Sequence, residues 1–165
     1  MDTDRRLVVE WTDPAEALPR FAELPGIEYL RQVRDGRLPA PPFSQVFGIG
    51  FGEIEDGRIE VTCDPVEAFF NPLGVVHGGL ACTILDTAVG CAVHTTLPAG
   101  TGYTSIDLSV SYLRPVLPSV GPLTAVGTVA KRGRRVAFAE AVLADEAGTV
   151  YATATSSLLV MGPQA

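Results

Sequence analysis

Alternating apolar and polar side chains predict strands on both sides of one long apolar segment. Residues 46–54 and 59–63 alternate, and the Asp56-Gly57 pair between them is typical of a two-residue hairpin turn. The most regular alternation covers residues 105–112. Three further strands are predicted after it, at residues 123–131, 135–145 and 149–161. The pattern therefore predicts two strands, one apolar segment and four more strands.

The alternation also predicts which side chains of the strand at residues 105–112 share a face. Four apolar side chains are expected on one face: Ile106, Leu108, Val110 and Tyr112. The serines and the aspartate between them would lie on the opposite face. Ser105 is therefore predicted to lie on the polar face of this strand.

The apolar segment begins at the Gly78-Gly79 pair, runs to about Thr96 and is long enough for one helix. Because it is apolar on nearly every side, we expect other structure to wrap around it. Together with the antiparallel hairpins, it predicts an α+β fold in which a curled antiparallel sheet surrounds one long buried helix. Asp86 lies inside this segment, and burying an ionised carboxylate costs several kcal/mol unless it is paired. Asp86 therefore needs a partner or a function.

The chain before the strands predicts short helices. Asp13 is expected to cap a first helix that begins at Pro14, and a second helix would cover Ile27 to Arg34. Pro39 to Pro42 would then form an extended connector.

Length and composition point to one globular domain. We expect a helical lead-in over residues 1–42, one domain over 43–161 and a short tail over 162–165. No apolar run approaches the ~20 residues of a membrane span, and the first residues lack the order of a signal peptide, so we expect a cytoplasmic protein without a membrane partner. A net charge of −7 argues against nucleic acid as a partner. The three cysteines lack metal-ligand spacing, and we expect neither a metal nor a cofactor.

One group of residues around the start of the predicted helix stands at a distinctive spacing. The histidine comes six residues after the asparagine, and the aspartate nine residues after the histidine: Asn71, His77, Gly78, Gly79 and Asp86. With the later Ser105-Ile106-Asp107 strand, this pattern resembles the hotdog-fold thioesterases over about residues 43–161. The nearest branch is that of the PaaI-like, phenylacetate-degradation-associated acyl-CoA thioesterases. The resemblance implies a hotdog fold and hydrolysis of an acyl-CoA thioester.

The resemblance implies roles for Asp86 and Gly78. Asp86 would act as a general base or nucleophile. The alternative is a buried acid that neighbouring hydroxyls, such as those of Thr83 or Thr87, satisfy. The Gly78 N–H, at a helix N-terminus, would polarise the thioester carbonyl. The alternative for Gly78 and Gly79 is a helix start that needs close packing or unusual dihedral angles.

The spacing of these two residues bears on the oligomeric state. Eight residues separate Gly78 from Asp86, so they would lie about 12 Å apart along one helix. A carbonyl held by Gly78 would be out of reach of Asp86 in the same chain. Either one of them is not catalytic, or Asp86 comes from a second subunit. The resemblance implies the second option, with composite sites in an obligate homodimer and pairs of dimers forming tetramers in some relatives.

Four further residues are candidates with structural alternatives. By resemblance Asn71 would orient water or the thioester, although Asn-Pro is also an ordinary turn. His77 would be an acid or base, or would only hold the loop before the helix. Ser105 would hydrogen-bond the water or Asp86, with Thr104 as the alternative if the strand register differs by one. Gly79 joins the substrate-binding candidates.

Basic residues are candidates for the phosphates of coenzyme A. Arg132 and Arg134 belong to a basic cluster in an acidic protein, although a solvated hairpin tip explains each of these residues somewhat better. Arg114 is a further phosphate candidate. The resemblance to the nearest branch favours substrates with an aromatic acyl group, and medium-chain acyl groups are the alternative.

Two other functions compete with thioester hydrolysis. A hotdog hydratase or dehydratase would use a differently placed His and Asp pair. A non-catalytic acyl-CoA-binding domain would usually carry a partner domain or lack the acid, whereas this chain keeps Asp86.

Overall fold

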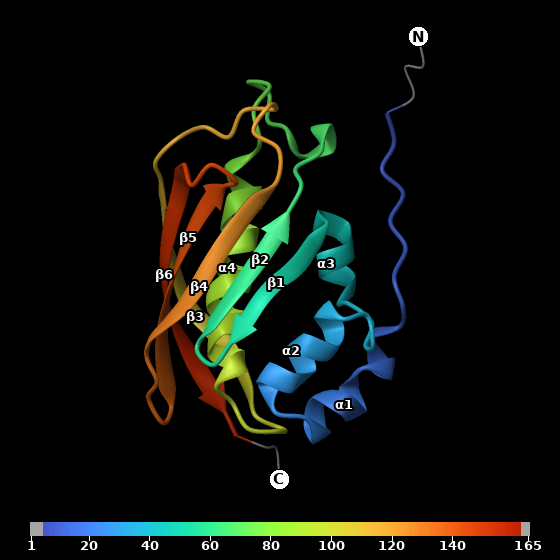
Figure 1. Cartoon of the computed structure of the whole chain (residues 1–165), viewed down its shortest axis with the longest axis vertical. Coiled ribbons are helices and arrows are strands. Elements are labelled where there is room, and N and C mark those ends of the chain that lie inside the picture. Colours follow the sequence, from blue (N-terminus) through green and yellow to red (C-terminus); the bar gives the residue numbers. More distant parts are fainter. Residues whose placement is uncertain (1–4, 163–165) are drawn as a thin grey trace.

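A computed structural model describes residues 5–162 and has a curled sheet around one long helix (Figure 1). The helices are α1 (Leu18–Glu23), α2 (Gly26–Arg34), α3 (Pro42–Phe47) and α4 (Gly78–Thr95), with short 3-10 turns at η1 (Pro14–Glu16) and η2 (Glu67–Phe69). The strands are β1 (Ile49–Glu55), β2 (Arg58–Cys63), β3 (Gly102–Tyr112), β4 (Leu123–Lys131), β5 (Val136–Asp145) and β6 (Val150–Met161).

The six strands form one antiparallel sheet in the order β1-β2-β4-β5-β6-β3. Helix α4 lies in the hollow of this sheet, and α1 to α3 lie beside β1 (Figure 1). The predicted order of two strands, one helix and four strands is confirmed, and so is the α+β hotdog architecture. The Asp56-Gly57 turn is also confirmed, because Gly57 takes a positive φ of 77° between paired Glu55 and Arg58.

The sheet-facing side of α4 forms the core. Ile84, Leu85 and Ala88 are fully buried against the strands. At Gly127 of β4 the helix comes so close that a Cβ atom would collide with the backbone carbonyl of Ala88. A glycine at this position therefore allows the helix to lie against the strand.

The prediction that Val46 and Phe47 begin the first strand is wrong. Pro42 starts helix α3, since its fixed φ suits the first turn and its missing N–H costs nothing there. Gly48 then ends the helix in the left-handed conformation, with φ 62°. The strand begins only at Ile49, so the extended connector gives way to a third lead-in helix.

The predicted face of Ile106 is also wrong. Strand β3 has a bulge between Ser105 and Asp107, where an extra residue interrupts the pairing with β6. Ile106 lies in this bulge and is 58% exposed. Because a bulge shifts the alternation by one residue, Ser105 pairs with fully buried Leu158 and lies on the helix-facing side of the sheet. Ser105 and Leu108 therefore share a face, which strict alternation excludes.

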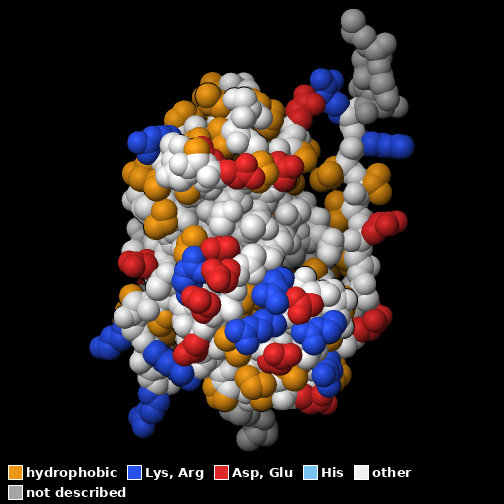
Figure 2. Space-filling view, viewed as in Figure 1, with side chains coloured by type: hydrophobic (Ala, Val, Ile, Leu, Met, Phe, Trp, Pro, Cys, Tyr) orange, Lys and Arg blue, Asp and Glu red, His pale blue; other side chains and the backbone are white. Residues whose placement is uncertain are grey.

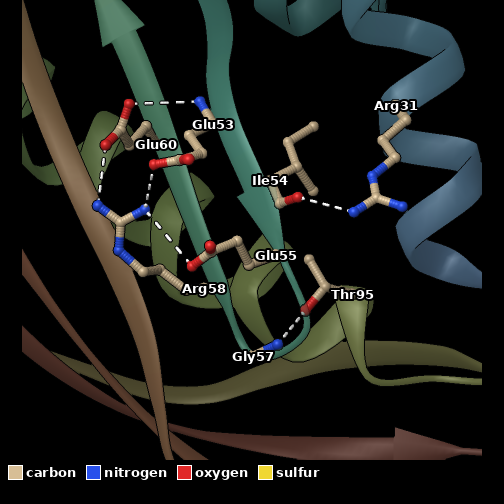
Figure 3. Close-up of polar contacts among 8 residues, drawn as sticks. All are labelled: Arg31, Glu53, Ile54, Glu55, Gly57, Arg58, Glu60 and Thr95. Carbon is tan, nitrogen blue, oxygen red and sulfur yellow. Dashed lines mark hydrogen bonds and ion pairs between the residues drawn. The ribbon is translucent and has the colours of Figure 1, made fainter.

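The lead-in helices are held by specific contacts. The Asp13 carboxylate accepts a hydrogen bond from the Ala15 N–H at 2.9 Å, as the predicted cap requires. Arg31 of α2 donates to the carbonyl of Ile54 in β1 at 3.0 Å (Figure 3). The Gly26 N–H donates to the Leu97 carbonyl just beyond α4, at 3.0 Å. Helix α2 is thus tied both to the sheet and to the end of α4.

Charged side chains cluster over α2 and the β1–β2 hairpin. Figure 2 shows acidic and basic side chains intermingled on this part of the surface. Within the hairpin, Arg58 pairs with Glu60 at 2.8 Å and with Glu53 at 3.2 Å (Figure 3). The Glu60 carboxylate also accepts from the Glu53 backbone N–H at 3.3 Å. These contacts join the two strands across the irregular pairing between Phe51 and Ile54.

This cluster predicts how stability depends on pH. The hydrogen bond from Arg58 lowers the pKa of Glu60 below its ordinary value of 4.5. Glu60 therefore stabilises the fold at pH values above its unfolded-state pKa, and this contribution is lost as pH falls through the lower folded-state pKa. We expect Glu60→Gln to lose about 1 kcal/mol of unfolding free energy at pH 7, in the upper range for a partly exposed pair. In urea titrations the gap between variant and wild type should close on acidification; a gap that is constant with pH would contradict this origin.

Candidate functional site

The N-terminus of α4 presents a free backbone donor. His77 caps the helix, and its Nδ1 accepts from the Gly79 N–H at 2.8 Å. The Leu80 N–H donates to the His77 carbonyl at 2.9 Å. The Gly78 N–H makes no hydrogen bond to any residue between 5 and 162, whereas the Gly78 carbonyl accepts from the Tyr112 hydroxyl at 3.1 Å. One N–H at the positive end of the helix dipole is thus available to an incoming oxygen.

The contact at His77 also defines its chemistry. A ring nitrogen that accepts a hydrogen bond carries no proton, so in this cap the imidazole is neutral and its proton lies on Nε2. The structure thus gives His77 the loop-holding role that was the structural alternative. Only its Nε2–H remains to act on a ligand.

Asp86 lies on the side of α4 that the sheet does not cover. Its side chain is exposed, and its Oδ1 accepts from the Ser105 hydroxyl at 3.0 Å. The bulge in β3 makes this contact possible, because it places Ser105 on the helix side of the sheet. The expected wrapping of α4 is confirmed, but one stripe of the helix stays open in this single chain. Exposed or half-buried residues at helical spacing form an open stripe from Gly79 through Cys82 and Thr83 to Asp86.

Thr104, the alternative to Ser105, is not the residue that meets Asp86. It is exposed and pairs with Leu159, one position away from the pairing of Ser105 with Leu158. Adjacent residues in a strand lie on opposite faces, so Thr104 lies away from the helix.

Asn71 serves the turn before α4. Its Oδ1 accepts from the Leu73 N–H at 2.9 Å and from the Val75 N–H at 3.4 Å. Its own backbone N–H donates to the Val75 carbonyl at 2.8 Å. The carboxamide oxygen is therefore occupied by the backbone, and the amide nitrogen is the part of Asn71 that remains for a ligand.

An apolar cavity of about 370 Å³ adjoins Asp86 and Ser105. Its remaining walls come from the lead-in helices, β1, α4 and β3: Phe21, Tyr29, Leu30, Val33, Pro41, Phe43, Ser44, Phe51, Thr87, Cys91, His94 and Tyr103. The residues at this cavity other than Asp86 and Ser105 were not predicted as site residues. The positions of Thr87, Cys91 and His94 on the same helix as Asp86 signalled their proximity, whereas the walls at Phe21 and Tyr29 depend on how short helices dock.

His94 is neutral at ordinary pH. It is buried between aromatic rings of the lead-in and β3, with ring centroids 5.2 Å from Phe21, 5.8 Å from Tyr29 and 5.6 Å from Tyr103. Burial lowers its pKa to about 4. Burial likewise raises the pKa of the neighbouring Cys91 thiol to about 12, so this cavity wall carries no thiolate.

Arg132 and Arg134 lie apart from this site in the single chain. Arg114 donates to the Val150 carbonyl at 2.7 Å. Arg132 and Arg134 border a separate cavity of about 320 Å³ beside Leu97, beyond the C-terminal end of α4. Since α4 has 18 residues, Gly78 lies about 27 Å along the helix from that end. Gly78 and Asp86 are themselves about 12 Å apart along the helix, so one chain does not bring the donor and the acid together.

Comparisons with known proteins identify the family. The model of the thioesterase superfamily matches residues 73–152. A protein of Halobacterium salinarum that is named as an esterase is 36% identical over 113 residues, 66% of this chain and 73% of its own. The chain belongs to the thioesterase superfamily. The resemblance to the hotdog thioesterases is confirmed, and so, for the family, is the enzyme class expected from it.

Other members of the thioesterase superfamily are similar over much of their length. Human acyl-coenzyme A thioesterase 13 is 28% identical over 120 residues, 72% of this chain and 84% of the human protein. A Ralstonia eutropha thioesterase, described as related to phenylacetic acid degradation, superposes with a TM-score of 0.73 at 28% identity. That superposition covers 79% of this chain and 98% of the Ralstonia protein.

None of the helices between residues 5 and 162 is long and apolar enough to cross a membrane. Within the same residues, no three His, Cys, Asp or Glu side chains are grouped as a metal ion would need.

Proposed function

We propose that this chain hydrolyses an acyl-CoA thioester to a free acid and coenzyme A. The observation that carries the proposal is the Ser105–Asp86 pair, exposed at the edge of an apolar cavity that could hold an acyl group. Family membership supports hydrolysis of a thioester. The name of the human relative, an acyl-coenzyme A thioesterase, supports the choice of substrate class.

Asp86 is the proposed acid–base group or nucleophile. Ser105 donates to Oδ1 and so fixes the carboxylate, which leaves Oδ2 for the chemistry. As a base, Oδ2 takes a proton from water while the hydroxide adds to the carbonyl; the tetrahedral intermediate expels the thiolate, which receives that proton. As a nucleophile, Oδ2 adds to the carbonyl and displaces the thiolate to form an anhydride, which water then cleaves. Both routes begin from an ionised Asp86.

The Gly78 N–H of a second copy is the proposed oxyanion donor. Within one chain the donor and the acid are too far apart to share a carbonyl, whereas two copies in antiparallel contact could pair them. Strand β3 lies at one edge of the sheet and pairs only with β6 among the described strands. Exposed strand edges are commonly covered by pairing. We therefore propose an obligate homodimer with two composite sites, either alone or as part of a tetramer.

The other candidates take supporting roles in this proposal. His77 positions the Gly78 donor by capping α4, and Gly79, whose N–H donates to His77, shapes the same turn. The Asn71 amide nitrogen is available to orient the carbonyl or the water. Arg114, Arg132 and Arg134 remain candidates for the phosphates of coenzyme A. Thr104 lies on the far face of β3 and has no role here. The cytoplasmic location expected from the sequence stays a prediction.

Release of free thiol from aromatic and aliphatic acyl-CoAs tests the proposed activity. We expect steady release from at least one member of such a panel by the purified chain. Folded protein that binds acyl-CoA but releases no thiol would instead support the acyl-CoA-binding alternative. Loss of substrate without thiol release would support a hydratase or dehydratase.

A further inference from the structure

We propose that the lead-in helices close the acyl site, and that Phe21 and Tyr29, packed on His94, set the longest acyl group that this chain accepts. This inference rests on the proposed hydrolysis of an acyl-CoA and deepens it. Phe21 and Tyr29 both precede the region matched by the family model, which begins at residue 73.

The cavity has an open end and a closed end. Asp86, Ser105 and Phe43 are exposed and mark its mouth, whereas Val33 and His94 are buried and mark its floor. Its volume of about 370 Å³ is near the lower limit of ligand pockets, which span roughly 300–1,000 Å³. A cavity of this size suits an acyl group and leaves coenzyme A outside.

The cavity extends along helix α4. Asp86 and His94 both line it and are eight residues apart, which corresponds to about 12 Å along the helix. A thioester carbonyl within reach of Asp86 at the mouth directs its acyl group toward His94. The depth available to the acyl group is therefore set by whatever closes the His94 end.

Aromatic rings close that end. Phe21 of α1 and Tyr29 of α2 pack edge to face at 5.6 Å, and both rings lie against the His94 ring. Because His94 is neutral, the closed end carries no charge that would oppose an apolar acyl group. The closed end is therefore built from contacts between rings.

Helix α2, which carries Tyr29 at the closed end of the cavity, is held in place by contacts on two sides. Gly26, the first residue of α2, donates to the Leu97 carbonyl at 3.0 Å. A Cβ atom at Gly26 would collide with the His94 carbonyl and lie 2.5 Å from its Cδ2. Arg31 ties the other side of α2 to β1. Because α2 is fixed on both sides, the wall that Tyr29 forms limits acyl length, whereas a loosely held segment would move aside.

Substitutions of Phe21 test this inference on a series of straight-chain acyl-CoAs from butyryl to palmitoyl. Wild type should show a length beyond which kcat/KM falls steeply. Phe21→Ala should move that limit to longer chains, with a gain of roughly tenfold or more just beyond the wild-type limit. Phe21→Trp should move the limit to shorter chains. Leu18→Ala is the matched control, since Leu18 is on the same helix, 65% exposed and outside the cavity.

The length profile also separates this inference from the proposed function. Calorimetric titration with the same acyl-CoAs measures acyl selectivity without turnover when the chains carry Asp86→Asn, alone or together with each Phe21 substitution. If wild type hydrolyses acyl-CoA and all three variants keep its acyl length limit, the inference is overturned and the function stands. If no chain hydrolyses acyl-CoA, but the longest acyl group that binds changes with the Phe21 substitutions, the function is overturned and the inference stands. Unchanged binding limits in folded Phe21→Ala and Phe21→Trp would overturn the inference in either case.

Discussion

Replacing Asp86 with asparagine is expected to lower kcat for acyl-CoA hydrolysis by about 10²–10⁴-fold, the range for loss of a general base. Asparagine keeps the shape of the side chain and can still accept from Ser105, but it can neither take a proton nor form an anhydride. Because Asp86 is exposed in the single chain, we expect little change in thermal stability. Thiol release under saturating substrate measures the effect.

Asp56→Asn is the matched control for Asp86→Asn. Asp56 lies in the β1–β2 hairpin turn, where Asn-Gly is as favourable as Asp-Gly. This variant makes the same charge change at a residue that does not line the cavity, and it should retain wild-type kcat. Wild-type turnover in Asp86→Asn would show that another group activates water, whereas equal losses in both variants would show an effect of net charge.

Replacing Gly78 with proline is expected to lower kcat by about 10²–10³-fold, the cost of removing one oxyanion donor. Proline removes the N–H without breaking the helix, because Gly78 is the first helical residue. The preceding residue, His77, already has the extended conformation that a following proline requires, with φ −64° and ψ 134°. Comparison of kcat with the melting temperature separates loss of the donor from loss of the fold.

Gly78→Ala is the control for this substitution, since it keeps the N–H. Its Cβ would lie 3.2 Å from the Tyr112 ring, which must shift slightly. We expect alanine to retain most of the activity that proline removes. Equal losses in both variants would mean that the space at Gly78 matters and that its N–H does not.

Local patterns in the sequence were enough to predict the architecture. The alternation of β2, β4, β5 and β6 and the apolar run of α4 each reflect burial against the same core, so they agree with one another. The motif spacing singled out residues that do lie around the start of α4 and on its open side, whereas the role of Asp86 stays a prediction. Its partner Ser105 was named correctly, although the strand pattern placed it on the wrong face.

The missed features depend on contacts between distant segments. The bulge in β3 is a property of its pairing with β6, and no residue within 105–112 marks it. Helix α3 was hidden by apolar residues that suit a strand equally well, and only Pro42 and Gly48 define its ends. The cavity was missed because its walls at Phe21 and Tyr29 meet His94 from segments more than sixty residues away. Short-range periodicity cannot report where a short helix docks.

Mixing the two inactive chains tests the composite site most directly. Differently tagged Asp86→Asn and Gly78→Pro chains would be co-expressed, and the dimer that carries both tags would be isolated. If the acid and the donor come from different subunits, this dimer has one intact site, and it should regain about half of the wild-type kcat per dimer while each parent dimer stays inactive. A mixed dimer that is as inactive as its parents would contradict the shared site and place the chemistry within a single chain.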